Sequence, residues 1–101
     1  MAYEAADFDA NLVAAAGDDT ALRAELRACF MESLRGQLDL LQRSRCDGNW
    51  EVAALRLRAL GTSFHALELM RLADEALDSA PGDPVILRKL RQFVEEFANR
   101  S

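Results

Sequence analysis

Apolar residues recur along this chain at the spacing of an α-helix, and no stretch alternates apolar and polar residues as a strand does. The clearest case is the stretch 49–66, which we place on a helix at about 100° per residue. One side of this helix collects Trp50, Ala53, Leu57, Leu60 and Phe64. Leu55 falls on the opposite side. The pattern therefore predicts a buried face and a second, exposed face with a leucine near its centre.

The pattern in the N-terminal half of the sequence predicts two helices. A short first helix carries Phe8, Leu12 and Val13 and ends at Gly17, and Asp18-Asp19-Thr20 then offers an N-cap. A long helix follows over about residues 21–45. Its expected buried stripe comprises Leu22, Leu26, Cys29, Phe30, Ser33, Gln37 and Leu41, widened by Leu34 and Leu38. A stripe of this width is enough to contact two neighbouring helices.

The C-terminal half predicts a break near His65 and then two more helices. Residues 66–80 form one, with Leu67, Met70, Ala73 and Leu77 expected to face inward. The turn 81–84 separates it from the last helix, which Asp83 caps and Pro84 begins. The inward positions of the last helix are Ile86, Leu90, Phe93, Val94 and Phe97. Short connections between four helices predict an all-α, antiparallel up-down four-helix bundle with a short extra N-terminal helix, as one domain over residues 1–101.

The amino-acid composition limits the classes of partner that the protein is expected to bind. The 101 residues carry a formal net charge of −5, and half of them are hydrophobic. An acidic domain argues against nucleic acid and against an anionic membrane surface, since both require a basic face. The N-terminus lacks the pattern of a signal peptide, and no apolar run is long enough to cross a bilayer. We therefore expect a cytoplasmic protein that binds neither membrane nor nucleic acid.

The residues available for catalysis are few. The chain has one histidine and two cysteines without paired spacing, and it has no phosphate-binding loop or nucleophile elbow. Cys29 lies on the expected buried stripe and is interpreted as a small core residue, whereas Cys46 lies near a loop and is open to exposure. We expect no enzyme activity, no cofactor and no metal.

One local pattern resembles a known family. It comprises Asn49-Trp50-Glu51, then Ala53-Ala54-Leu55-Arg56-Leu57-Arg58-Ala59, then Ser63-Phe64-His65-Ala66 and Leu69. This pattern, and the order of helices over nearly the whole chain, resembles the histidine-containing phosphotransfer (HPt) domain of bacterial two-component phosphorelays. The family places a tryptophan at the start of the helix and then the motif A-H-x-L-K-G. The resemblance implies an HPt-like helical bundle that contacts a response-regulator receiver domain or a histidine kinase.

The resemblance is incomplete at the reactive position. Leu57 and Arg58 match the leucine and the basic residue of the motif, but Leu55 stands where the family has its phosphorylated histidine. Ala59 replaces the following glycine, and His65 replaces a second glycine. In the family, the imidazole accepts a phosphoryl group from an aspartyl phosphate of the receiver. A leucine side chain has no lone pair, so no phosphoryl group can pass through Leu55.

Three hypotheses follow. The first is a phosphotransfer-deficient module that docks on a receiver or kinase, with help from the long helix, and acts by occupying it. Its expected docking face comprises Glu51, Val52, Leu55, Arg58, Ala59 and Thr62. The second is an active phosphotransfer protein that uses His65, although His65 lies at a helix end and lacks the basic and small residues downstream. The third is a helical assembly unit that dimerises through Leu55. A monomer or a weak dimer is expected.

Overall fold

The computed structural model describes residues 12–99, and all regular secondary structure in this range is helical. Residues 12–16 form a short helical stretch. The longer helices are α2 (Thr20–Arg43), α3 (Asp47–Phe64), α4 (Leu67–Leu77) and α5 (Pro84–Ala98). The predicted all-α class is confirmed. Helix α2 begins one residue before and ends two residues before the predicted bounds, and α4 is shorter than predicted by one residue at its start and three at its end. Helix α3 ends at Phe64, directly before the predicted break near His65.

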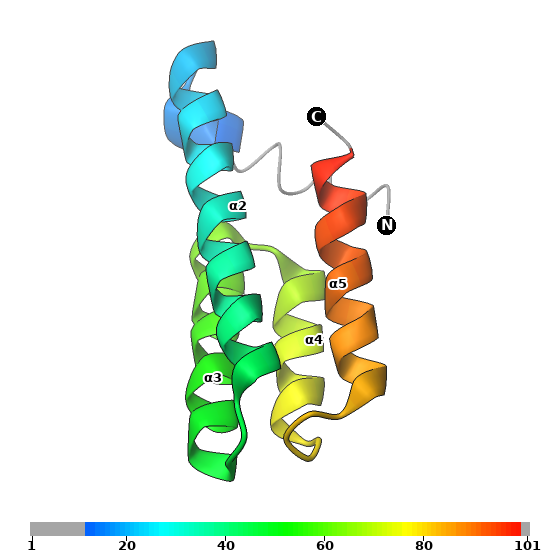
Figure 1. Ribbon diagram of the computed structural model, residues 1–101. Helices are drawn as coiled ribbons and strands as arrows, with labels where there is room; N and C mark the ends of the chain where they lie inside the picture. The colour runs from blue at the N-terminus through cyan, green and yellow to red at the C-terminus, as the bar shows by residue number, and fades with distance from the viewer. Residues whose placement is uncertain (1–11, 100–101) are drawn as a thin grey trace.

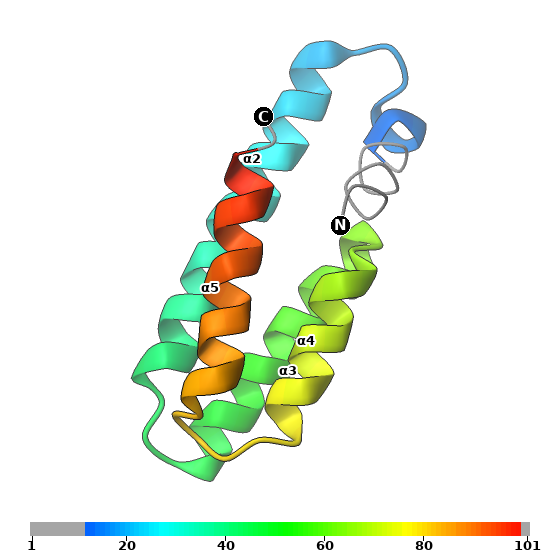
Figure 2. The same cartoon turned by 90° about the vertical axis from the view of Figure 1, so that its right-hand side faces the viewer.

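The helices α2 to α5 run alternately up and down and lie side by side (Figures 1 and 2). Helix α2 packs against α3 and α5, and α4 packs against the same two helices. Helices α3 and α5 therefore occupy opposite corners of a helical bundle. This arrangement leaves one side of α3 without a covering helix within residues 12–99.

Local capping signals define two of the helix starts. The Asp19 carboxylate accepts a hydrogen bond of 2.9 Å from the backbone N–H of Leu22. At α5, the Asp83 carboxylate accepts a bond of 2.9 Å from the N–H of Val85, and Pro84 occupies the first turn. Side-chain caps of this kind satisfy N–H groups that have no partner inside the helix. Both predicted caps are confirmed.

Helix α3 contributes one side of the core. Trp50, Ala53, Ala54 and Leu57 are buried, and the Trp50 indole Nε1 donates a 2.7 Å hydrogen bond to the backbone oxygen of Ala76 in α4. From the other helices come Phe30, Leu34, Leu38, Leu41, Leu69, Leu72, Ala73, Ala76, Ile86, Leu87, Leu90 and Phe97. The predicted inward residues Leu60, Phe64, Phe93 and Val94 are partly buried and pack against this cluster.

The predicted stripe of α2 was partly wrong. Cys29, Leu22 and Ser33 are exposed, whereas Phe30, Leu34 and Leu41 are fully buried. The buried arc of Phe30, Leu34, Leu38 and Leu41 is centred near Leu34, and Cys29 lies about 140° away from this centre around the helix. Leu22 lies in the first turn of α2, which projects beyond the end of α3 (Figure 1).

One further core prediction, at Leu67, was wrong. Leu67 is 55% exposed, because α4 turns Leu69, Leu72 and Ala76 inward and Leu67 lies roughly opposite to them. Val13 is 42% exposed, whereas Leu12 beside it is buried. Phe8 lies outside the described residues. The left-handed backbone of Gly17, with φ of 66°, agrees with its predicted position at the end of the first helix.

Candidate functional site

The uncovered side of α3 carries all six residues predicted for the docking face. The side chains of Val52 and Leu55 are 49% and 48% exposed. The other four residues, Glu51, Arg58, Ala59 and Thr62, are exposed as well. Their spacing of three and four residues places them along one side of the helix. The structure thus brings the predicted set together as one continuous surface, which we call the Leu55 face.

The orientation of the Leu55 face is fixed from the opposite side of α3. Leu57 is fully buried two residues after Leu55, and the buried hydrogen bond from Trp50 fixes the first turn against α4. Rotating α3 to bury Leu55 would expose Leu57 and break the bond of Trp50. Burial of a leucine is worth about 1.5–3 kcal/mol, so packing strongly disfavours that rotation.

Arg58, the basic residue of the Leu55 face, forms an ion pair with a carboxylate of the same chain. The Arg58 Nε donates to the Asp74 carboxylate of α4 at 2.7 Å, and the Thr62 hydroxyl donates to the backbone oxygen of Arg58 at 3.0 Å. The ion pair crosses from α3 to α4 at the edge of the Leu55 face. Arg58 therefore carries a balanced charge, and a phosphate or carboxylate from outside has to compete with Asp74 for it.

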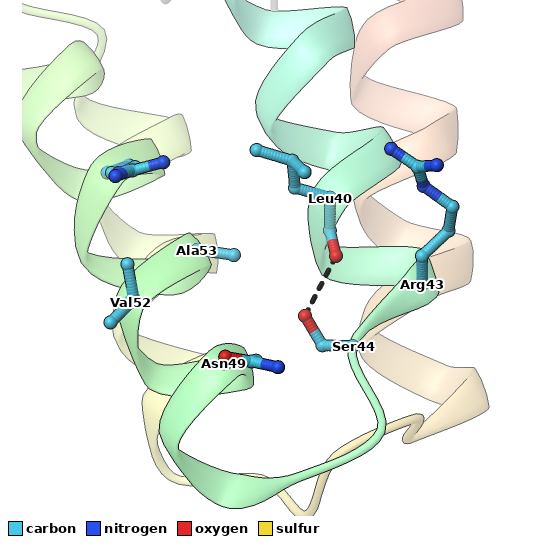
Figure 3. Close-up of a pocket in the computed structure, with 7 residues that line it drawn as sticks. Leu40, Arg43, Ser44, Asn49, Val52 and Ala53 are labelled. Atoms are coloured by element: carbon cyan, nitrogen blue, oxygen red, sulfur yellow. Dashed lines mark hydrogen bonds between the residues drawn. The ribbon is translucent and has the colours of Figure 1, made fainter.

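On the other side of Val52, a groove of about 450 Å³ separates α3 from the end of α2. Figure 3 shows Leu40, Arg43 and Ser44 on one wall, with Asn49, Val52 and Ala53 on the other. The Ser44 hydroxyl donates to the backbone oxygen of Leu40 at 2.8 Å, which stabilises the last turn of α2. Leu40 is 39% exposed, so apolar surface continues from the Leu55 face across to α2.

Of the described residues that line this groove, Val52 alone belongs to the predicted docking face, and Leu40 and Arg56 are among those that sequence reasoning missed. A signal for Leu40 was present in the pair Leu40-Leu41, because Leu41 belongs to the predicted buried stripe and Leu40 lies about 100° away from it around the helix. Arg56 follows Leu55 directly and was assigned no role. Its position at the groove depends on the packing of α2 against α3, which the sequence of α3 does not contain.

His65 lies at the C-terminal end of α3, away from the centre of the Leu55 face. Its backbone is left-handed, with φ of 55° and ψ of 36°. The N–H of His65 donates to Thr62 O at 3.2 Å, and that of Ala66 donates to Gly61 O at 2.8 Å. This pair of bonds is a Schellman motif, which ends the helix. The predicted break is confirmed, and the His65 imidazole is exposed at the bend.

The remaining candidate groups are separate from one another. Cys29 and Cys46 are free and exposed, in agreement with the expectation for Cys46 only. Among residues 12–99, no group of three or more His, Cys, Asp or Glu side chains is placed so that it could bind a metal ion. No helix in the same range combines the length and the apolar character needed to cross a bilayer.

No protein-family model, curated protein or solved structure matches the chain. The geometry of the Leu55 face and its neighbouring groove therefore carries the functional argument.

Proposed function

We propose that this protein is an HPt-like docking module of a two-component phosphorelay that binds a receiver or histidine-kinase domain without carrying phosphate. The observation that carries the proposal is the exposure of Leu55 at the position where the resemblance places the phosphorylated histidine. A leucine there supplies apolar contact surface and no nucleophile.

Two more features support docking over chemistry. Ala59 is a small residue one turn after Leu55, and the exposed Thr62 follows about one turn later, so another protein can approach the helix backbone closely. The Asp74 carboxylate partly neutralises the Arg58 guanidinium, so an incoming phosphate has to compete with Asp74 for it. A module with these properties acts by occupancy, because it covers the partner's phosphorylation site while offering no group that accepts phosphate.

The first experiment is a binding assay against the purified receiver and histidine-kinase domains of the source organism. We expect at least one of them to bind, and Leu55→Arg to abolish that binding. The matched control is Val85→Arg, because Val85 is 50% exposed on α5 and the substitution adds the same charge and bulk. Failure of every domain to bind, or equal binding by the Leu55→Arg variant, would contradict the proposal.

The two alternatives are outcomes of companion assays. Incubation with a phosphorylated receiver that leaves an acid-labile label on the protein, lost in His65→Ala, would establish phosphotransfer through His65. Sedimentation that shows a concentration-dependent dimer, abolished by Leu55→Arg, would favour the assembly unit. We expect no label on the wild-type protein, and a monomer or a weak dimer that Leu55→Arg leaves unchanged.

A further inference from the structure

The groove between α2 and α3 differs from the rest of the molecule in its charge. The chain as a whole carries −5, but the seven described residues that line the groove include two arginines, Arg43 and Arg56, and no acid. Arg43 is paired with Asp39 at 3.0 Å, one turn earlier in α2. Arg56 forms no ion pair with any residue in the range 12–99. Its guanidinium is the cation at this groove that is available to a partner.

Apolar surface lies next to this cation. Leu40 and Val52 face the groove from opposite walls while remaining 39% and 49% exposed, and Leu55 follows Val52 by one turn. Surface leucines and valines are ordinary when scattered, but a contiguous set beside a groove is typical of a binding surface. A shallow groove between two helices that presents apolar residues suits an amphipathic helix of a partner.

We propose that this groove binds an amphipathic segment of the partner protein through apolar contacts with Leu40 and Val52, and that Arg56 pairs with a carboxylate on that segment. The inference deepens the proposed docking function and rests on it, since the groove adjoins the Leu55 face at Val52. It identifies Arg56 as a specificity-determining residue, because a guanidinium next to apolar surface favours an acidic partner and disfavours a basic one.

The test uses two fluorescent peptides of two heptads each, with leucine at the a and d positions and either glutamate or lysine at the others. The net charge of −5 attracts the lysine peptide to the protein in general. Tighter binding of the glutamate peptide would therefore report a local site. We expect the glutamate peptide to bind more tightly at physiological salt, where screening weakens the general repulsion by the net charge, with amide shifts in NMR spectra centred on Leu40, Val52 and Ala53.

Substitutions separate the effect of Arg56 on peptide binding from the effect of the protein's overall charge. Arg56→Gln should weaken binding of the glutamate peptide by about 1.5- to fivefold, as expected for loss of one partly exposed ion pair. Arg88→Gln on α5 is the control, because it removes the same charge from an exposed position on the helix opposite α3. Val52→Lys should weaken the binding of both peptides by blocking the groove.

Preference for the lysine peptide, no binding of either peptide, equal effects of Arg56→Gln and Arg88→Gln, or shifts located away from the groove would each overturn the inference. No receiver or kinase takes part in this test. Its failure would therefore leave the docking assay of the proposed function unaffected, and the two results can be told apart.

Discussion

Arg58 and Asp74 form an ion pair across the interface of α3 and α4, with 2.7 Å between Nε and Oδ1. The resemblance assigns to Arg58 the basic position that steadies the charge of a phosphoryl group. In this protein the same guanidinium is balanced by a carboxylate of the chain itself. The pair makes the edge of the Leu55 face nearer to neutral, which favours apolar docking over the binding of an anion.

The first prediction concerns the strength of this pair. Its side chains are 45% and 54% exposed, so solvent screens the attraction and the coupling should be about 0.2–1 kcal/mol. A double-mutant cycle of Arg58→Gln and Asp74→Asn, measured by urea unfolding, should show this coupling, and it should shrink in high salt. Strictly additive effects would mean that the two side chains do not interact in solution.

The second prediction concerns Gly61, which is buried in α3. A Cβ placed there would lie 2.8 Å from Met70 Cγ, 3.1 Å from Met70 N and 3.2 Å from Ala66 O, so α4 approaches too closely for a side chain. Gly61→Ala should lower the free energy of unfolding by about 1 kcal/mol, despite the better helix propensity of alanine. Thermal unfolding followed by circular dichroism measures the change.

Gly36 provides the control for this prediction. It lies inside α2 with nothing within 4 Å of an added Cβ. Gly36→Ala should therefore raise the free energy of unfolding by about 0.5–1 kcal/mol. If both substitutions stabilised the protein equally, the close approach of α3 and α4 would be wrong.

The third prediction separates the two sides of α3. Leu57→Ala should cost about 2–5 kcal/mol, because Leu57 is fully buried and its loss leaves a cavity. Leu55→Ala should change the free energy of unfolding by less than about 0.5 kcal/mol, since Leu55 is 48% exposed. Chemical denaturation followed by Trp50 fluorescence gives both values. A large loss for Leu55→Ala would place that side chain in the core and remove the docking surface.

The fourth prediction is a pH dependence at α4. The hydrogen bond from the Arg71 guanidinium, which lies 2.6 Å from Glu68 Oε1, lowers the pKa of Glu68. A depressed carboxylate pKa adds stability above the pKa of the unfolded chain, and that stability is lost as the pH falls through the folded pKa. Glu68→Gln should therefore destabilise the protein by a few tenths of a kcal/mol at neutral pH. Urea unfolding in acid should show no difference from wild type, and a difference that grows with acidity would contradict the sign.

Local rules account for most of what the sequence could predict. The caps at Asp19 and Asp83, and the turn before Pro84, depend on a few adjacent residues, so their positions could be read directly. The exposure of Leu55 followed from the helical angle alone, because Trp50 and Leu57 define the buried side of α3. These predictions needed no knowledge of the neighbouring helices.

The wrong predictions concern side chains whose burial depends on how neighbouring helices pack. Cys29 and Leu67 were expected inside because each belongs to a plausible apolar stripe, but a competing stripe on the same helix faces the core. The Arg58–Asp74 pair, the tight contact at Gly61 and the groove at Arg56 each join residues of two helices. Their formation depends on the relative rotation of those helices, which periodicity within one helix does not fix.

The most direct test places a histidine at the position that the resemblance assigns to the phosphorylated residue. Leu55→His, made together with His65→Ala, places a single imidazole at the centre of the Leu55 face. Incubation with phosphorylated receivers of the source organism should leave an acid-labile phosphoryl label on this variant and none on the wild-type protein. Absence of label from the variant, or a label on the wild-type protein that disappears in His65→Ala, would contradict the assignment of Leu55 to the phosphotransfer position.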